Sequence, residues 1–96
     1  MSQDLIPGVA VATPLSEARI GRAGVIQKVS GALAPRDVLE PDELERRLLE
    51  LGFVEGARVE VLHEGLIGAD PMAVKLDDMR VAIRRREARA IEVLFD

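Results

Sequence analysis

The sequence predicts a mainly β domain: a small barrel of about five short strands, with one or two short helices. Two observations indicate this fold. Apolar and polar residues alternate in several short stretches, and turn-forming residues recur roughly every eight to twelve positions between them. Such alternation buries one face of each strand, as a barrel of this size requires.

Composition limits the possible functions. The 96 residues suit one domain, and a hydrophobic fraction of 48% is enough for a core, which must be aliphatic because Phe53 and Phe95 are the aromatic residues. Nucleic-acid binding is not expected, because the net charge is -4 and there is no Trp or Tyr to stack on bases. The absence of cysteine excludes disulfides, thiolate metal sites and cysteine nucleophiles.

The N-terminal residues 1–14 are expected to form a flexible extension or a tail lying against the domain, and residues 15–96 to form the domain itself. The opening MSQDLIPGVAVATP lacks the basic start of a secretion signal, and Pro7 and Gly8 interrupt its apolar run. No apolar run approaches the roughly 18 residues of a membrane span. We therefore expect a soluble, cytoplasmic protein without direct membrane insertion.

The first half of the domain contains one expected strand and one expected helix. A brief turn at 15–18 precedes a β-branched strand over 23–29, and 30–40 has the composition of a connection. The helix is predicted over 41–51. Pro41 suits its first position, where a backbone N–H would lack a partner, and Gly52 suits the left-handed position past its end. Phe53 is then expected to fold back onto the last turn.

The buried stripe of this helix is predicted from its leucines. Leu44, Leu48 and Leu51 recur at helical spacing, and Leu49 widens the stripe. Asp42 and Glu43 lie in the first turn, where the helix dipole favours negative charge. We expect this stripe to close one open end of the barrel.

The second half alternates more regularly. Strands are predicted over 57–63, 72–76 and 79–83, followed by a last strand that contains Ile91 and Val93. The reversals between them are expected to be a long turn over 64–71, a tight turn at Asp77-Asp78 and a polar turn at RRREARA, 84–90. The residues expected to face inward are Val59, Val61, Met72, Val74, Leu76, Met79, Val81 and Ile83.

No catalytic constellation is present. The single histidine, His63, is expected to be an ordinary strand residue, although it could join carboxylates in a weak or intersubunit metal site. Phosphate-binding and dinucleotide-binding glycine motifs and nucleophile elbows are absent. Asp77-Asp78 is most simply a solvated turn. We expect no enzyme, no catalytic residue, no metal ligand and no cofactor.

Two features are candidates for partner binding. Basic residues are concentrated at Arg84, Arg85 and Arg86, with Arg80 and Arg89 nearby and Arg46 and Arg47 on the predicted helix. Guanidinium groups bind carboxylates and phosphates, so an acidic partner is one interpretation, and a solvated turn with neighbouring glutamates is the other. Leu66 and Ile67 lie in a glycine-flanked loop, where they either form an exposed contact or pack back over the barrel.

These stretches together resemble a known family. LERRLLELGFVEGARVEVLHEG, then GADP, then VAIRRREARAIEV, is similar to the FeoA family of ferrous-iron transport accessory proteins over about residues 15–93. The resemblance implies an SH3-like barrel, also found as the C-terminal domain of repressors of the diphtheria-toxin-repressor type. It also implies that this protein is a cytosolic partner of FeoB, the membrane permease for Fe(II). The candidate partner-binding residues are Arg46, Arg47, Leu66, Ile67, Asp70, Arg84 and Arg85.

Alternatives to simple docking remain open. The protein could activate the permease's GTPase with an arginine finger, Arg47 or Arg85. It could instead be a metal-binding, metal-responsive module like the repressor domain. Peptide binding of the usual SH3 type is disfavoured, because two phenylalanines cannot line an aromatic groove. Self-association is plausible because small barrels leave strand edges open.

Overall fold

The computed structural model describes residues 11–35 and 40–96, including their side chains except those of Leu66 and Ile67. Within these ranges six antiparallel strands form one sheet in the order β1-β6-β2-β3-β4-β5. The strands are β1 (Thr13–Pro14), β2 (Ala23–Val29), β3 (Arg58–Ile67), β4 (Asp70–Leu76), β5 (Met79–Ile83) and β6 (Ile91–Phe95). The helices are α1 (Pro41–Leu51), α2 (Arg85–Ala88) and the short 3₁₀ turns η1 (Leu15–Glu17) and η2 (Gly31–Leu33).

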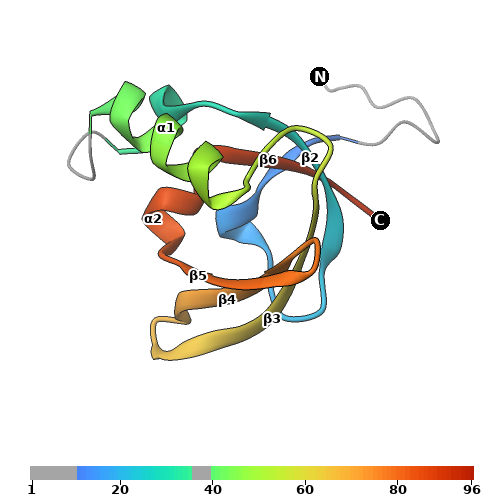
Figure 1. Ribbon diagram of the computed structural model, residues 1–96. Helices are drawn as coiled ribbons and strands as arrows, with labels where there is room; N and C mark the ends of the chain where they lie inside the picture. The colour runs from blue at the N-terminus through green and yellow to red at the C-terminus, as the bar shows by residue number, and fades with distance from the viewer. Residues whose placement is uncertain (1–10, 36–39) are drawn as a thin grey trace, which may run out of the picture.

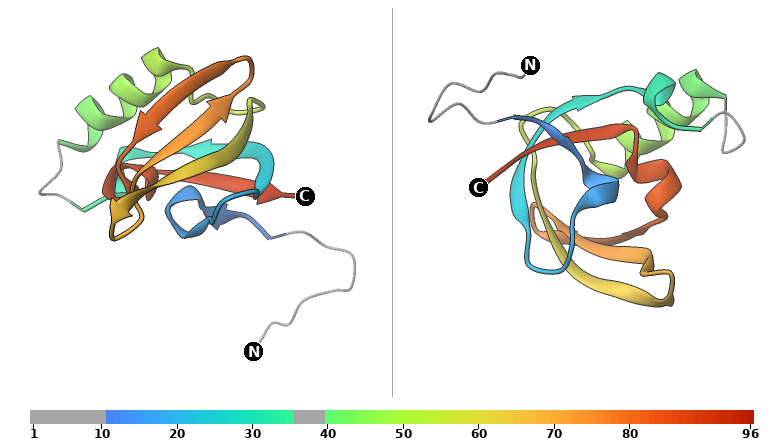
Figure 2. Two further views of the ribbon diagram at one scale, coloured as in Figure 1. Left: turned by 90° about the horizontal axis from the view of Figure 1, so that it is seen from below. Right: turned by 180° about the vertical axis from the view of Figure 1, so that it is seen from behind.

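The sheet curls around its own core, as Figures 1 and 2 show, and α1 lies across the opening that the curved sheet leaves. The predicted mainly β class is confirmed, and the arrangement is an SH3-like fold. The core is aliphatic, as expected from the composition: Phe53 is fully buried, and Phe95 packs half-buried against the core. No polar or charged residue is buried within the described ranges.

The predicted start and end of α1 are confirmed. Pro41 is the first helical residue, and Gly52 follows the helix with a φ of 108°, in the left-handed region. The N–H of Gly52 donates to the Leu49 carbonyl at 3.0 Å, and the N–H of Phe53 donates to the Leu48 carbonyl at 3.0 Å. These two bonds satisfy carbonyls that the helix end leaves without partners, and they direct Phe53 into the core.

The predicted buried stripe of α1 is only half right. Leu44 and Leu48 are buried, but Leu51 is 38% exposed and Leu49 is 41% exposed. Successive helical residues are turned by about 100°, so Leu49 lies well around the helix from Leu48. Leu51 belongs to the last turn, where the core no longer covers the helix. The C-terminal end of α1 therefore carries exposed apolar side chains.

The prediction of a long turn over 64–71 is wrong. Strand β3 continues to Ile67 and β4 begins at Asp70, so the reversal consists of Gly68 and Ala69, with φ of 63° and 59°. The β3–β4 register shifts twice, which interrupts the alternation that would have identified the strand. Gly65 lies inside β3, where a Cβ would come within 2.0 Å of the Asp70 carbonyl oxygen.

Two further segments differ from expectation. The polar turn predicted over 84–90 contains the one-turn helix α2, and Ala88 and Ala90 are buried beneath it. The sheet begins at Thr13, which pairs with Val93 of β6. Within the connection predicted over 30–40 the structure shows η2, while residues 36–39, like residues 1–10, lie outside the described ranges.

Candidate partner-binding surface

The side chain of Arg85 connects three distant segments of the chain. Its Nη1 donates to the carbonyls of Ser16 and Ala18 at 2.7 and 2.9 Å. Its Nε donates to the Ala69 carbonyl at 2.8 Å, and its Nη2 donates to Glu64 Oε1 at 2.5 Å. The side chains of Arg85 and Glu64 are 16% and 15% exposed. The planar fork of an arginine suits this task, because it presents several donors in fixed directions.

Asp70 completes this arrangement, called the Arg85 cluster below. Its Oδ1 accepts a hydrogen bond from the backbone N–H of Arg85 at 2.9 Å, at the first residue of α2. The cluster therefore ties together η1, the β3–β4 turn and α2. Asp70 and Arg85, two of the partner-binding residues predicted from the sequence, thus form hydrogen bonds within the chain that link the β3–β4 hairpin to α2. Their part in partner binding stays a prediction. As a candidate arginine finger, Arg85 would first have to release these bonds.

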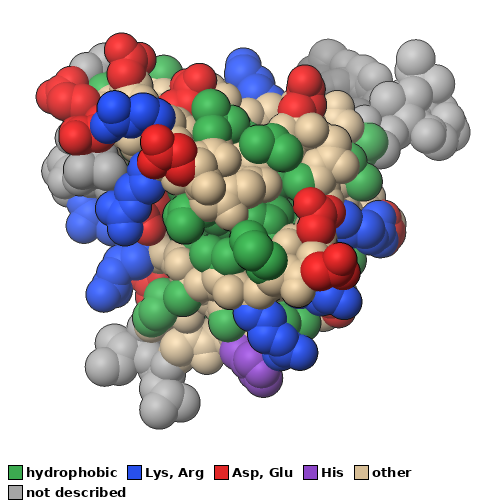
Figure 3. Space-filling model, viewed as in Figure 1, with side chains coloured by type: hydrophobic (Ala, Val, Ile, Leu, Met, Phe, Trp, Pro, Cys, Tyr) green, Lys and Arg blue, Asp and Glu red, His purple; other side chains and the backbone are tan. Residues whose placement is uncertain are grey.

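The other arginines are exposed. Arg46 and Arg47 of α1 and Arg84, Arg86 and Arg89 around α2 form what we call the arginine face. Arg47 Nη1 lies 3.9 Å from Glu87 Oε2, which links α1 to α2, and the Arg47 side chain remains 61% exposed. Figure 3 shows basic side chains running down the left margin of the molecule, over α1 and α2, with acidic side chains among them at the upper left. The structure therefore brings the two predicted arginine groups onto adjacent elements.

The remaining predicted residues, Leu66 and Ile67, are placed by their backbone alone. They form the end of β3, at the tip of the hairpin that projects at the lower edge of Figure 1. Their side chains lie outside what the structure describes, so both interpretations, an exposed contact and packing back over the barrel, stay predictions.

Sequence reasoning missed an apolar surface. Leu51 is 38% exposed, Val54 is 41% exposed and Met79 is 54% exposed. The Met79 methyl carbon lies 3.9 Å from the position that a Cβ on Gly52 would occupy, so β5 meets the end of α1 here. We call these three residues the apolar patch. Figure 3 shows hydrophobic side chains gathered in the middle of this face, between α1 and β5.

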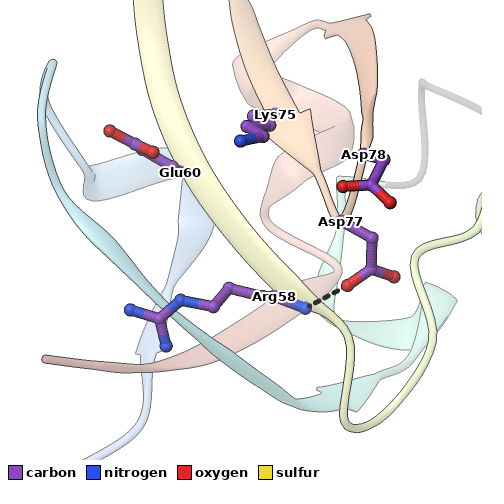
Figure 4. A pocket seen from close by; sticks show the side chains of 5 residues that line it. All are labelled: Arg58, Glu60, Lys75, Asp77 and Asp78. Carbon is purple, nitrogen blue, oxygen red and sulfur yellow. Dashed lines mark hydrogen bonds between the residues drawn. The ribbon is translucent and has the colours of Figure 1, made fainter.

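A polar cavity lies elsewhere on the sheet, at the β3 and β4 strands and the β4–β5 turn. Its volume is about 470 Å³, and its lining is Arg58, Glu60, Lys75, Asp77 and Asp78 (Figure 4). The Arg58 N–H donates to Asp77 Oδ1 at 3.0 Å, and the Arg58 guanidinium pairs with Asp96. Glu60 is the cross-strand partner of Lys75. Basic and acidic groups are therefore mixed here, with no single sign of charge to select a ligand.

The described residues offer little to a metal ion. Among them, no group of three or more His, Asp and Glu side chains is placed to hold one. His63 is an exposed residue of β3. In the described ranges, no helix is both long and apolar enough to cross a membrane.

The fold and its exposed surfaces define a small SH3-like domain that presents an arginine face and an apolar patch. The FeoA domain model matches residues 13–94, and the chain belongs to this family. FeoA domains are accessory domains of iron transport and not a known enzyme family, and membership supports a role related to ferrous iron transport. No curated protein matches the chain.

Solved structures agree with this assignment. The FeoA of Stenotrophomonas maltophilia, solved with zinc, is 31% identical with a TM-score of 0.66, and the match covers 91% of this chain and 96% of that one. The FeoA protein of Chlorobium tepidum is 31% identical with a TM-score of 0.64, covering 85% and 70%. A manganese-dependent transcriptional repressor bound to manganese has a TM-score of 0.72 at 22% identity, covering 93% of this chain and 39% of the repressor, which shows the shared fold.

Proposed function

We propose that this protein is a cytosolic accessory protein of ferrous iron uptake, which regulates an FeoB-like membrane permease by binding to it. Family membership over residues 13–94 supports the connection to iron transport. The Stenotrophomonas maltophilia relative is described as an SH3 domain protein and a candidate ferrous iron transport activating factor. A regulatory role by protein contact fits a chain whose described residues hold no group suited to a metal ion.

The arginine face is the observation that carries the proposal. The chain is acidic overall, with a net charge of -4, yet α1 and α2 present exposed arginines on adjacent elements. Within the described residues, Arg46 and Arg89 have no acidic side chain at ion-pair distance, and Arg47 has one at 3.9 Å. Exposed guanidinium groups without close partners are free to bind carboxylates, so the complementary surface on the permease is acidic.

Binding to the cognate permease tests the proposal. The permease is purified in detergent or nanodiscs, and its affinity for the wild-type chain is measured at low and moderate salt. The double variant Arg47→Glu/Arg89→Glu reverses two charges of the arginine face. We expect it to weaken binding by about tenfold or more, with the wild-type affinity falling as salt rises.

A control is Lys28→Glu, which reverses one exposed charge on β2, an element that carries none of the arginine-face residues. Its affinity should stay close to that of the wild type. The variant Leu66→Asp/Ile67→Asp tests the hairpin tip in the same assay, and unchanged binding by that variant would remove the tip from the interface. Lack of binding between wild type and permease in both preparations would contradict the proposed function.

A further inference from the structure

Strand β5 forms an open edge of the sheet. In the strand order β1-β6-β2-β3-β4-β5 it has β4 as its one neighbour, and the other edge strand, β1, comprises only Thr13 and Pro14. Within the described residues, the backbone of Met79–Ile83 makes no hydrogen bond outside its ladder with β4. An edge of this kind presents unpaired N–H and C=O groups that can pair with another extended chain.

The usual protections of an edge strand are few here. The segment Met79–Ile83 reads MRVAI, without proline, and its ladder with β4 runs without a register shift. Arg80 is its one charged residue. Proteins normally protect such an edge with charges, proline or bulges, or cover it with another element. The main contacts of α1 are with η2 and β2. Only the C-terminal end of α1, at Gly52, is shown to meet β5, at Met79.

The apolar patch borders this open edge. Met79 begins β5, and Leu51 and Val54 lie at the end of α1 and just beyond it. Figures 1 and 2 show α1 on the side of β5 that faces away from β4, so the patch stands beside the place where another strand would add. Such a strand would satisfy the edge through its backbone and would bury alternate side chains against Leu51, Val54 and Met79.

Charges of opposite sign lie at the two ends of β5. Asp77 and Asp78 precede Met79 in the β4–β5 turn, and Arg84 follows Ile83 next to the arginine face. In Figure 3 acidic and basic side chains are mixed to the right of the hydrophobic area, and basic side chains predominate along the left margin. A segment bound along β5 is therefore best matched when its acidic end lies beside Arg84 and its basic end beside the β4–β5 turn.

We propose that β5 and the apolar patch bind an extended segment of the partner, which adds to the sheet as a further strand. The segment has apolar residues at alternate positions and acidic residues at the end next to Arg84. This inference rests on the proposed function, because the partner is the permease of that proposal. The inference goes beyond that proposal in specifying which surface of this protein binds the permease and in which conformation the permease segment binds.

A second copy of this chain fits the edge less well. Pairing two β5 strands about a two-fold axis would place both α1 helices on the same side of the joined sheet. In each copy α1 already stands beside the open edge (Figure 2). The two helices would then compete for the space above the new strand pair, whereas a single extended segment brings no helix with it.

Two variants test the inference against one control. Met79→Asp and Val54→Asp each place a charge in the apolar patch, and Ile20→Asp places the same charge on a residue that is 58% exposed outside the patch. All three sites are exposed, and circular dichroism confirms that each variant is folded. With the permease in nanodiscs as the probe, we expect the first two variants to weaken binding about tenfold or more, and Ile20→Asp to change it less than about twofold.

Hydrogen exchange provides the second measurement. Amides of 79–83 that point away from β4 should exchange at least about tenfold more slowly when wild type binds the permease. Binding by wild type with unchanged exchange in β5 and full affinity of Met79→Asp would overturn the inference and leave the proposed function standing. Failure of wild type to bind would instead overturn the proposed function. If amide exchange in β5 of the free protein instead slows as the protein concentration is raised, the occupant of the edge is a second copy of this chain. That result would also overturn the inference.

Discussion

Replacement of Arg85 by alanine tests whether the Arg85 cluster holds the fold together. The guanidinium donates to three backbone carbonyls and to Glu64, and all of these bonds are lost in the variant. Hydrogen bonds that involve a charged group contribute about 1.5–3 kcal/mol each in net terms, and these contributions do not simply add. Removal of one partner of a buried ion pair costs about 3–5 kcal/mol.

The expected loss lies at the lower end of that range. Arg85 and Glu64 retain 16% and 15% exposure, so water can reach part of the gap. Glu64 also keeps Arg19, whose Nε lies 3.4 Å from the same carboxylate oxygen. We therefore expect Arg85→Ala to lower the free energy of unfolding by about 3 kcal/mol. In a domain of this size that corresponds to a decrease in Tm of roughly 12–24 °C.

Urea and thermal unfolding followed by circular dichroism measure this loss. Arg85→Lys keeps the charge, but one ammonium group cannot reach all four acceptors, so we expect an intermediate loss of about 1–2 kcal/mol. Arg89→Ala removes an exposed arginine of the same segment and should change stability by less than about 0.5 kcal/mol. A loss below about 1 kcal/mol for Arg85→Ala would refute the idea that the cluster joins the three segments energetically.

Three other predictions concern the helix and the metal question. Gly52→Ala should lower the free energy of unfolding by about 1–2 kcal/mol, because φ is 108° and the new Cβ would lie 3.3 Å from Leu76 Cδ2. An unchanged midpoint of urea unfolding would show that the turn adapts. In the same experiment Leu48→Ala should lower the free energy of unfolding by about 2–5 kcal/mol, because Leu48 is buried. Leu49→Ala should lower it by less than about 0.5 kcal/mol, because Leu49 is 41% exposed. Equal losses would contradict this difference in burial. Treatment with a chelator should leave Tm within about 1 °C, since the described residues form no ligand group; a larger decrease would show that a bound metal stabilises the fold.

The parts of the fold that the sequence predicts well depend on local signals. Pro41 marks the start of α1 and Gly52 marks its end. Each does so through its own backbone preference: proline has a fixed φ and no N–H, and glycine tolerates a positive φ. Strand β4 is recognised because Met72, Val74 and Leu76 alternate without a bulge and are all buried. In both elements the residues that decide the structure lie within a few positions of one another.

The parts that it misses depend on distant contacts or on interrupted patterns. The bulges of β3 change which side chains face inward, so the end of this strand is mistaken for a turn. The four residues of α2 are too few to show helical periodicity. The acceptors of the Arg85 guanidinium lie between 16 and 69 residues away in sequence, so no local pattern indicates them. Sequence periodicity also finds the apolar face of β5 without showing that Met79, at the start of this strand, is 54% exposed.

Arg85 and Asp70 are predicted partner-binding residues, yet in the structure they hold segments of the chain to one another. Leu51, Val54 and Met79 are 38%, 41% and 54% exposed, so their substitution should change binding more than stability. A change in the Arg85 cluster should instead reduce stability first, and should reduce binding only as far as it unfolds or displaces the hairpin and α2. Measuring the free energy of unfolding and the permease affinity for the same variants therefore separates residues that build the fold from residues that contact the partner.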